Sequence, residues 1–302
     1  MKNKGKGAPN RADTRPEAKH PGAERNLRID AHHHLWRYTP QEFDWLEGDL
    51  AGLRRDYLPN DLLREMESAG VTGAVVVQAR QTVDETSWLL DTAAANPEIL
   101  GVVGWLPIAA TDFESVLERF AGKRNLKGLR HVVQAEPEGF LDGDGFNHGM
   151  AHLAGRDLAY DLLIHKGQME EAIRFVDRHP AQALVLDHMA KPSIASGTIE
   201  PWARNLRELA RRPHVTCKIS GMVTEASAAW TVDDLTPYLD VVLDAFTPAR
   251  LMIGTDWPVL TPRCSYSQWW QTVMDWAAHL SIDEQRDLQG GTAARVYDLK
   301  PD

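Results

Sequence analysis

The chain alternates eight short apolar runs with segments of helical periodicity, and this alternation constrains its fold more than any other feature. Because a helix between two strands returns the chain to the same edge of a sheet, the alternation predicts a parallel sheet. The strands are expected at residues 27–32, 73–78, 100–105, 126–133, 159–165, 183–188, 215–220 and 251–256. Eight such units fill about 250 residues, the size of a (β/α)8 TIM barrel. An open doubly wound sheet is disfavoured because no glycine-rich phosphate loop follows the first strand.

In a closed barrel the carboxyl ends of all strands meet at one mouth, where the chemistry of such folds takes place. The first predicted strand runs into three consecutive histidines, and strand alternation puts Asp30, His32 and His34 on one face. Two imidazoles on one face can hold a metal ion or polarise a carbonyl oxygen. Further titratable side chains fall at or near the ends of later strands, namely Arg130, His131, His165, His188, Lys218 and Asp256.

Composition argues against several classes of protein. The chain has 302 residues and a formal net charge of -10, which is unlike a nucleic-acid-binding protein because such proteins need a basic face. No apolar run approaches the ~18 residues of a membrane span. The two cysteines, Cys217 and Cys264, have neither zinc-site nor disulfide spacing, so we expect a cytoplasmic location. The sequence makes no prediction of the oligomeric state.

Residues 1–25 differ in composition from the rest of the chain. They contain seven basic and three acidic side chains together with several glycines and prolines. Such a segment buries too little apolar surface to fold, so we expect a disordered, solvated basic tail in preference to a partner-binding or targeting segment. It lacks the apolar run of a secretory signal. Residues 26–302 are expected to form one barrel domain.

Six short motifs, in a fixed order from Arg28 to Leu299, carry a resemblance to a known family. They are Asp30-Ala-His-His-His34-Leu-Trp36, Lys127-Gly-Leu-Arg130-His131, Asp187-His188-Met-Ala-Lys191-Pro192, Cys217-Lys218-Ile-Ser-Gly221, Gly254-Thr-Asp256-Trp-Pro258 and Gly290-Gly-Thr-Ala-Ala-Arg-Val-Tyr297. With these motifs the chain resembles the amidohydrolase superfamily, in the branch of lactone hydrolases that includes L-fuconolactonase, L-rhamnonolactonase and 2-pyrone-4,6-dicarboxylate lactonase. The resemblance implies a (β/α)8 barrel and a hydrolase of the carboxylic ester class that opens a small lactone.

The resemblance also carries over four catalytic residues, His32, His34, His188 and Asp256. Their chemistry agrees with lactone opening, because a lactone carbonyl becomes an oxyanion when water adds, and preorganised imidazoles can stabilise that oxyanion. Asp256 can take the proton of the water as a general base. Two structural alternatives stay open: Asp256 as the N-cap of the following segment, and His188 as a buried imidazole bonded to a neighbouring loop.

Five residues are candidates for substrate binding: Arg130, His131, Lys218, Trp36 and Trp257. Arg130 suits a clamp on a hydroxyl or carboxylate, or a structural pair with a loop acid. Lys218 is expected either to orient the substrate or to stabilise a strand end by pairing with Asp187 or Asp256. The two tryptophans directly follow strand ends and could wall a pocket.

The strand ends suit one metal ion better than two. A binuclear centre of the amidohydrolase kind needs a bridging carboxylated lysine or a glutamate at the end of the fourth strand. That strand offers Arg130 and His131 there, with Lys127 at its other end. A single Zn²⁺ could be held by His32, His34, His165 and Asp256. Because the related lactonases include members that work without metal, we expect catalysis without an obligatory metal, with Asp256 free to act on water.

The predicted function is hydrolysis of an aldono-1,4- or 1,5-lactone of a sugar or deoxy-sugar to its open-chain acid, within carbohydrate metabolism. One alternative is a metal-dependent decarboxylase of an aromatic or unsaturated acid, which shares the His-x-His pair and the aspartate of the eighth strand. Another is a non-catalytic binding protein on a decayed barrel. Lactone opening releases a titratable proton without carbon dioxide, so one assay separates the two reactions.

Overall fold

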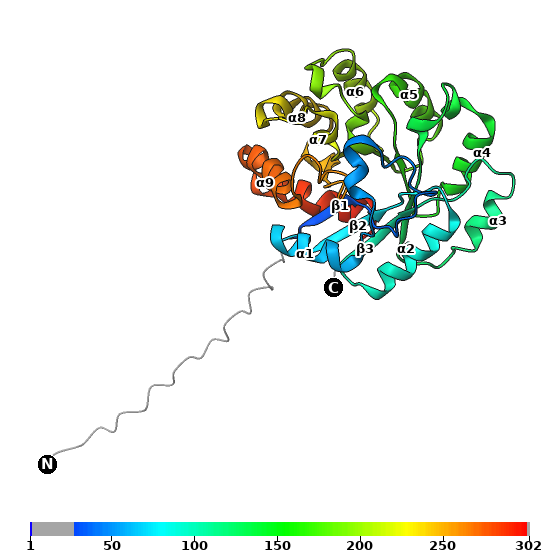
Figure 1. The fold of residues 1–302 in the computed structure, drawn as a ribbon, viewed down its shortest axis with the longest axis horizontal. Coiled ribbons are helices and arrows are strands. Elements are labelled where there is room, and N and C mark those ends of the chain that lie inside the picture. The colour runs from blue at the N-terminus through cyan, green and yellow to red at the C-terminus, as the bar shows by residue number, and fades with distance from the viewer. Residues whose placement is uncertain (2–26, 301–302) are drawn as a thin grey trace.

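Eight parallel strands form the centre of the structure, a computed structural model that describes Met1 and residues 27–300. The strands are β1 (Ile29–His33), β2 (Gly73–Val77), β3 (Ile99–Gly104), β4 (Leu126–His131), β5 (Ala159–Leu162), β6 (Leu184–Leu186), β7 (Val215–Ile219) and β8 (Leu251–Ile253). Each strand pairs with the next along the chain, and the helices lie around them (Figure 1). The predicted (β/α)8 TIM barrel is therefore confirmed. The expected tail falls, from residue 2 onward, outside the described residues.

Backbone hydrogen bonds join the segment after β8 to the end of β1. His33 and Trp257 form a parallel bridge. The His34 N–H donates to the carbonyl oxygen of Trp257 at 2.6 Å, and the Asp256 N–H donates to that of His32 at 2.7 Å. The backbone itself therefore brings His32, His34 and Asp256 side by side at the mouth of the barrel.

The helices follow the strands in the order that the sequence predicts. They are α1 (Pro59–Ala69), α2 (Val83–Ala95), α3 (Phe113–Glu118), α4 (Asp144–Leu153), α5 (Met169–Arg178), α6 (Trp202–Ala210), α7 (Met222–Glu225), α8 (Val232–Phe246), α9 (Tyr266–Trp276), α10 (Ile282–Arg286) and α11 (Thr292–Val296). The first of them ends at Gly70, whose φ of 65° is the left-handed conformation that glycine adopts without a steric cost. Among the described residues, no helix combines the length and the apolar character needed to cross a membrane.

Apolar side chains fill two separate layers. The larger layer lies between the strands and the helices and includes Leu129, whereas the smaller one fills the barrel interior and includes Val75. Tyr297 and Leu299 also belong to the interior layer, and Leu299 packs against Gly101 near the start of β3. The C-terminal segment therefore covers the end of the barrel opposite to the mouth.

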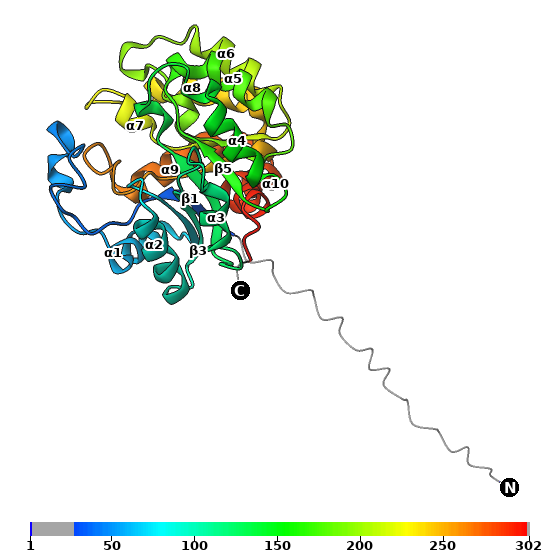
Figure 2. The same ribbon diagram turned by 90° about the vertical axis from the view of Figure 1, so that its right-hand side faces the viewer.

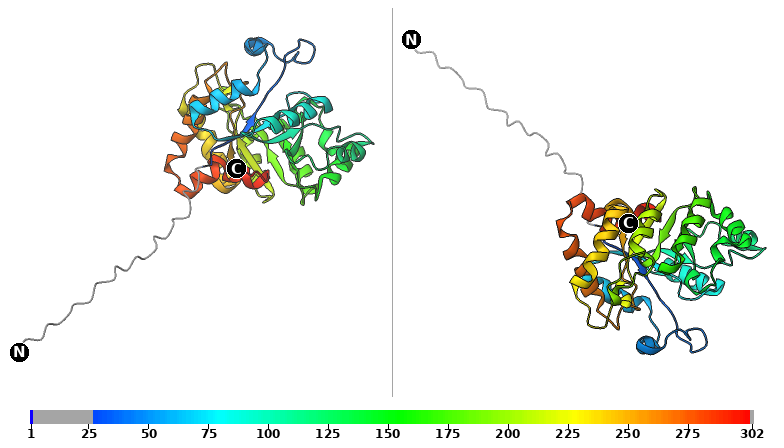
Figure 3. Two further views of the ribbon diagram at one scale, coloured as in Figure 1. Left: turned by 90° about the horizontal axis from the view of Figure 1, so that it is seen from below. Right: turned by 90° about the horizontal axis from the view of Figure 1, so that it is seen from above.

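A long segment, residues 34–58, joins β1 to α1. Trp36 and Tyr57 pair through their backbones, with N–H to oxygen distances of 3.0 and 2.9 Å, and a 3-10 helix spans Gly48–Leu53. In Figure 1 this segment, in blue, lies in front of the barrel, and Figures 2 and 3 show it projecting from the barrel body. An ion pair of 2.7 Å between Arg263 and Asp49 ties it to the segment after β8. The segment thus forms one side of the mouth.

Candidate active site

A bulge in β1 decides which histidines face the barrel interior. Asp30 and His33 both pair with β2 residues that belong to the layer between strands and helices, and the register shifts between them. His32 and His34 therefore point toward the interior, and Asp30 points outward. The expectation that Asp30 shares a face with the two histidines is wrong, because the extra residue of the bulge breaks the alternation of the strand.

Asp30 instead ties β1 to the segment after β8. Its carboxylate accepts hydrogen bonds from the N–H and the hydroxyl of Thr255, at 2.9 and 2.6 Å, and from the N–H of His32 at 3.0 Å. Burial raises the pKa of Asp30 to about 6, although the hydrogen bonds from Thr255 act in the opposite direction. This carboxyl group holds the two backbone segments that carry His32 and Asp256.

The hydrogen-bond partners of the ring nitrogens determine which nitrogen of His34 and of His32 faces Asp256. The Nδ1 of His34 lies 2.8 Å from the carbonyl oxygen of Val77, which can only accept, so in the neutral ring Nδ1 carries the proton and Nε2 offers a lone pair. This Nε2 lies 3.2 Å from Asp256 Oδ1 and 3.3 Å from His32 Nε2. The Nδ1 of His32 lies 3.3 Å from Asp187 Oδ1, which leaves its Nε2 directed toward Asp256 Oδ1 at 3.7 Å.

His188 reaches the same place from a left-handed turn that follows β6. His188, Met189, Ala190 and Lys191 all have φ between 51° and 58°. Each such non-glycine residue costs roughly 1–2 kcal/mol, and such runs persist only where the surrounding structure fixes them. The Nδ1 of His188 lies 2.9 Å from Ser220 Oγ. Burial lowers the pKa of His188 to about 4, so the ring is neutral at pH 7.

Asp256 completes the cluster from the loop after β8, where its own φ is 60°. Burial alone would raise its pKa, but His188, His34 and His32 hold the pKa of this carboxyl well below its ordinary value. The carboxylate is therefore ionised at neutral pH. The next long helix, α9, is capped by the Ser265 side chain. The Asp256 side chain thus contacts histidines, and the N-cap of α9 is Ser265 and not Asp256.

The donor atoms of this cluster fit a metal ion. His32, His188 and Asp256 each offer one ligand atom, all within 4.8 Å of one another, and His34 adjoins them. Imidazole lone pairs and a carboxylate oxygen repel one another at such distances unless a proton or a metal ion lies between them. Arg130 approaches His32 Nε2 only at 3.4 Å. Nitrogen and oxygen donors in this number suit a single divalent ion such as Zn²⁺.

A fully buried charge network lies deeper in the barrel. Lys218 Nζ is 2.5 Å from Asp161 Oδ2 and 3.1 Å from Asp187 Oδ1, and Arg130 Nη1 is 3.1 Å from Asp187 Oδ2. Burial alone would raise the pKa of Asp187, but Lys218 and His32 hold it well below its ordinary value. Of the two alternatives for Lys218, the structure has the pairing with Asp187, and it adds Asp161 as a second partner.

A cavity of 490 Å³ opens beside the cluster. Of the predicted site residues, His34, Arg130, His188 and Asp256 line it. It is also lined by residues that the sequence analysis did not assign to the site, among them Glu42, Asp44, Trp45, Arg80, Gln134 and Lys191. The buried Oε1 of Gln134 has no hydrogen-bond partner among the described residues. These side chains were missed because loops carry no periodicity; Lys191 alone stood inside one of the six motifs.

Two predicted site histidines lie apart from the cluster. His131 bonds to Glu136 through Nε2 at 2.7 Å, accepts from the indole N–H of Trp105 at 3.1 Å and stacks on Phe140. It does not line the cavity, because its ring is committed to these neighbours. His165 is exposed and does not join the metal-ligand group found in the described part of the chain. Its β5 ends early, at Leu162, which leaves His165 in a loop.

The two tryptophans expected to wall the pocket also lie behind it. Trp36 and Trp257 are buried and pack edge-on against Tyr57, with ring centroids 5.1 and 5.3 Å apart. The indole N–H of Trp36 donates to the carbonyl oxygen of Arg55 at 2.8 Å. Trp45, which is 40% exposed, lines the cavity in their place. This correction follows from the path of the segment after β1, which turns Trp36 toward its own core.

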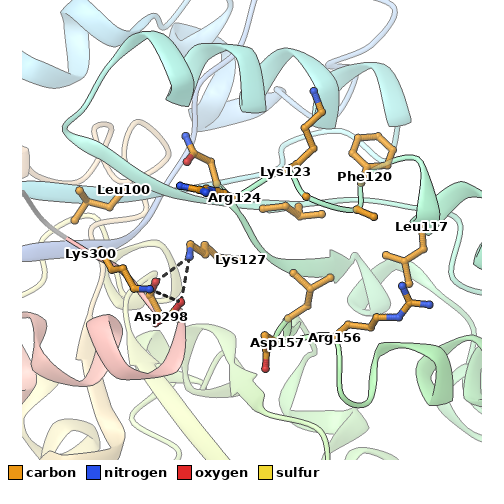
Figure 4. A pocket seen from close by; sticks show the side chains of 15 residues that line it. Leu100, Leu117, Phe120, Lys123, Arg124, Lys127, Arg156, Asp157, Asp298 and Lys300 are labelled. Carbon is orange, nitrogen blue, oxygen red and sulfur yellow. Dashed lines mark hydrogen bonds and ion pairs between the residues drawn. The ribbon is translucent and has the colours of Figure 1, made fainter.

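A second cavity, of 790 Å³, lies near the starts of β3 and β4 and the C-terminal segment (Figure 4). Its cationic side chains are Lys123, Arg124, Lys127, Arg156 and Lys300. Lys127 donates to the carbonyl oxygen of Asp298 at 2.8 Å. None of the predicted catalytic or substrate-binding residues lines this cavity, so we assign the site to the mouth.

Comparisons with known proteins bear on the family of this chain. Residues 29–299 match the family described as amidohydrolase. An L-fucono-1,5-lactonase from Burkholderia multivorans is 40% identical over 286 residues, which cover 90% of this chain and 96% of that protein. An L-fucono-1,5-lactonase from Burkholderia ambifaria is 35% identical over 234 residues, covering 77% of this chain and 81% of that protein.

A solved structure bears on the metal. The crystal structure of an amidohydrolase from Burkholderia multivorans with bound zinc is 40% identical, has a TM-score of 0.87, and covers 91% of this chain and all of that one. Together with the donor set of His32, His188 and Asp256, this finding does not support the expectation of a site that works without metal.

Proposed function

Since this chain belongs to the amidohydrolase family, we propose that it hydrolyses a small sugar lactone, an aldono-1,4- or 1,5-lactone, to the open-chain acid. The observation that carries the proposal is the ionised Asp256 among three imidazoles at the wall of a cavity, on a chain 40% identical to an L-fucono-1,5-lactonase. L-Fucono-1,5-lactone, a deoxy-sugar lactone, is the first substrate to test.

In the proposed reaction Asp256 acts as general base. It takes a proton from a water molecule while the water oxygen bonds to the lactone carbonyl carbon and the carbonyl electron pair moves onto its oxygen. That pair returns as the bond from the carbonyl carbon to the ring oxygen breaks. The proton passes from Asp256 to the ring oxygen, which leaves as a hydroxyl group, and the new carboxylic acid releases a proton to solvent.

The remaining lining residues suit binding of a polyhydroxylated ring. Arg130 and Lys191 bring positive charge to the cavity, and the free Oε1 of Gln134 can accept from a sugar hydroxyl. Trp45 offers an aromatic face. A divalent ion held by His32, His188 and Asp256 would supply a Lewis acid for the carbonyl oxygen and lower the pKa of bound water. We propose Zn²⁺ for that ion.

We place the enzyme in the cytoplasm and in carbohydrate metabolism. Both cysteines are free and buried, as suits a reducing compartment. The acidic net charge of -10 supports a small-molecule substrate over a nucleic-acid partner.

The general-base role predicts that Asp256→Asn lowers kcat by about a hundredfold or more while the fold is kept. The measurement is proton release from a panel of aldonolactones with a pH indicator, with circular dichroism to confirm folding. Asp157→Asn is the matched control, because Asp157 is an exposed aspartate that also has positive φ but lines only the second cavity. An Asp256→Asn enzyme that turns over like the control would contradict the mechanism, and carbon dioxide without lactone opening would favour the decarboxylase.

The metal assignment predicts that dialysis against a chelator removes about one zinc per chain and abolishes most lactonase activity. One equivalent of Zn²⁺ should restore it, and elemental analysis of the same samples gives the stoichiometry. Full activity in a chain shown to hold no metal would contradict the metal assignment and support catalysis by the protein side chains alone.

A further inference from the structure

A line of buried polar contacts runs along the barrel interior from the C-terminal segment to the histidine cluster. At one end, the hydroxyl of Tyr297 lies 2.8 and 2.9 Å from the two carboxylate oxygens of Asp161. Asp161 pairs with Lys218, and Lys218 also contacts Asp187, which lies 3.3 Å from His32 Nδ1. The line thus starts beside the closed end of the barrel and stops at a ring whose other nitrogen faces Asp256.

Lys218 is the central group of this line. Its side chain is 0% exposed, as are those of its two carboxylate partners, and it does not line the cavity at the mouth. A substrate in that cavity has no path to the ammonium group. The candidate role of Lys218 in substrate binding therefore has no support in the structure. Lys218 is the second-last residue of β7, and Ser220, the partner of His188, directly follows that strand.

The contacts of His32 Nδ1 show what Lys218 can do. This nitrogen has Asp187 Oδ1 and Lys218 Nζ at the same distance, 3.3 Å. Lys218 can donate to Nδ1 only in the tautomer that carries its proton on Nε2, and that tautomer has no lone pair on Nε2 for a metal ion. When Nε2 offers its lone pair, the proton lies on Nδ1, and of these two neighbours only Asp187 can accept it. Lys218 neutralises Asp187 and fixes its Oδ1 in that position, together with Arg130 on Oδ2.

We propose that Lys218 is a positioning residue that acts through Asp187 to hold His32 in the tautomer and ring orientation that present Nε2 to the reaction site. Asp161 and Tyr297 anchor Lys218 from the far end of the barrel. The inference deepens the proposed function and rests on it for the activity readout only. Groups that orient a histidine ligand in this way commonly change metal affinity or activity by about 10- to 100-fold when they are removed.

The test must avoid an uncompensated buried charge. Lys218→Met alone would leave two carboxylates facing each other in the interior, which can prevent folding. The double variant Asp161→Asn/Lys218→Met removes one charge of each sign and leaves the pair of Asp187 with Arg130 intact. Val103→Ala is the matched control, because Val103 belongs to the same interior layer but to none of these polar contacts, and its truncation only weakens packing.

Four quantities are measured on the wild-type, double-variant and control proteins: thermal stability, the zinc dissociation constant by competition with a chelator, and kcat and KM on the best lactone. We expect the double variant to bind zinc about 10- to 100-fold more weakly and to lose kcat by a similar factor, with KM changed less than twofold. The control should lose stability and keep the zinc affinity.

Two results would overturn the proposal. Zinc affinity and kcat within twofold of wild type would make Lys218 a purely structural residue, and a raised KM with unchanged kcat would make it a substrate-binding one. The zinc measurement needs no substrate and therefore tests the positioning role independently of the reaction. A wild-type enzyme that opens no lactone would refute the proposed function, and the zinc affinities would still decide the role of Lys218.

Discussion

Single polar contacts determine the chemistry of individual side chains at this site. The carbonyl oxygen of Val77 gives the Nδ1 of His34 its acceptor, and Ser220 Oγ lies beside the Nδ1 of His188. Each contact leaves Nε2 directed toward Asp256. The reactive arrangement therefore depends on groups that do not themselves face the cavity, and their loss should affect turnover more than substrate affinity.

The same holds for Glu85, which orders the loop after β2. Its carboxylate accepts the N–H groups of Ala79 and Arg80, at 3.1 and 2.7 Å, and both of these residues line the cavity. Burial raises the pKa of Glu85 to about 7 from an ordinary value of 4.5, although its contacts with Arg80 oppose the shift. The folded protein thus holds a proton here that the unfolded chain has already released at pH 5 to 7.

This raised pKa predicts a pH-dependent difference between wild type and Glu85→Gln. The stabilising effect of the protonated carboxyl is complete below pH 4.5 and is lost as the pH rises through 7. Between pH 5 and pH 8 wild type should therefore lose up to about 3 kcal/mol of unfolding free energy relative to Glu85→Gln. Denaturant unfolding of both proteins at the two pH values measures this difference. A constant difference would show that Glu85 is ionised in the folded state throughout.

At the scale of elements, the strands were predictable and their ends were not. Alternation of apolar runs identified all eight strands, because a barrel strand is buried on both faces and gives a continuous apolar signal. The bulge in β1 has no such signal, since three consecutive histidines fit either alternation. Alternation therefore predicts the wrong face for Asp30. The position of Trp36 directly after the strand predicts a pocket wall, which Trp45 provides instead. Loop geometry depends on contacts distant in sequence.

The projecting segment after β1 predicts a role for Trp45 in substrate affinity. Its indole is 40% exposed and lines the cavity, so a sugar ring packed on it would bury apolar surface worth about 1.4 kcal/mol, a factor of ten in affinity. We expect Trp45→Ala to raise KM about tenfold with kcat changed less than twofold, as steady-state kinetics would show. Ile282→Ala, a truncation at an exposed apolar residue away from the cavity, is the control. A fall in kcat at constant KM would place Trp45 in the reaction step instead.

At the scale of the whole molecule, the two ends of the barrel have different tasks. The mouth gathers the histidine cluster and the loops that line the cavity, and the C-terminal segment covers the opposite end and sends Tyr297 into the interior. This division was predictable in outline, because closure of eight parallel strands puts every carboxyl end at one mouth. The interior network of Asp161, Lys218 and Tyr297 was not, since three residues so far apart in sequence show no common pattern.

Residues 1–25 are predicted to be dispensable for catalysis, because β1 begins only at Ile29 and their composition cannot support a packed core. A chain that starts at Asn26 should keep kcat and KM within about twofold of the full-length protein. Steady-state kinetics and size-exclusion chromatography on both proteins provide the comparison. A folded but inactive shortened chain would mean that the tail reaches the mouth or holds an assembly together.

The left-handed turn that carries His188 restricts which stabilising substitutions this protein can accept without losing turnover. Four consecutive non-glycine residues there keep a conformation that glycine would adopt without penalty, so replacing Ala190 by glycine would relieve steric strain in the native state. The same replacement would loosen the segment that aims the imidazole at Asp256. Glycine in this turn would thus raise heat resistance but lower turnover. In a lineage exposed to higher temperature, we therefore expect stabilising mutations elsewhere in the molecule.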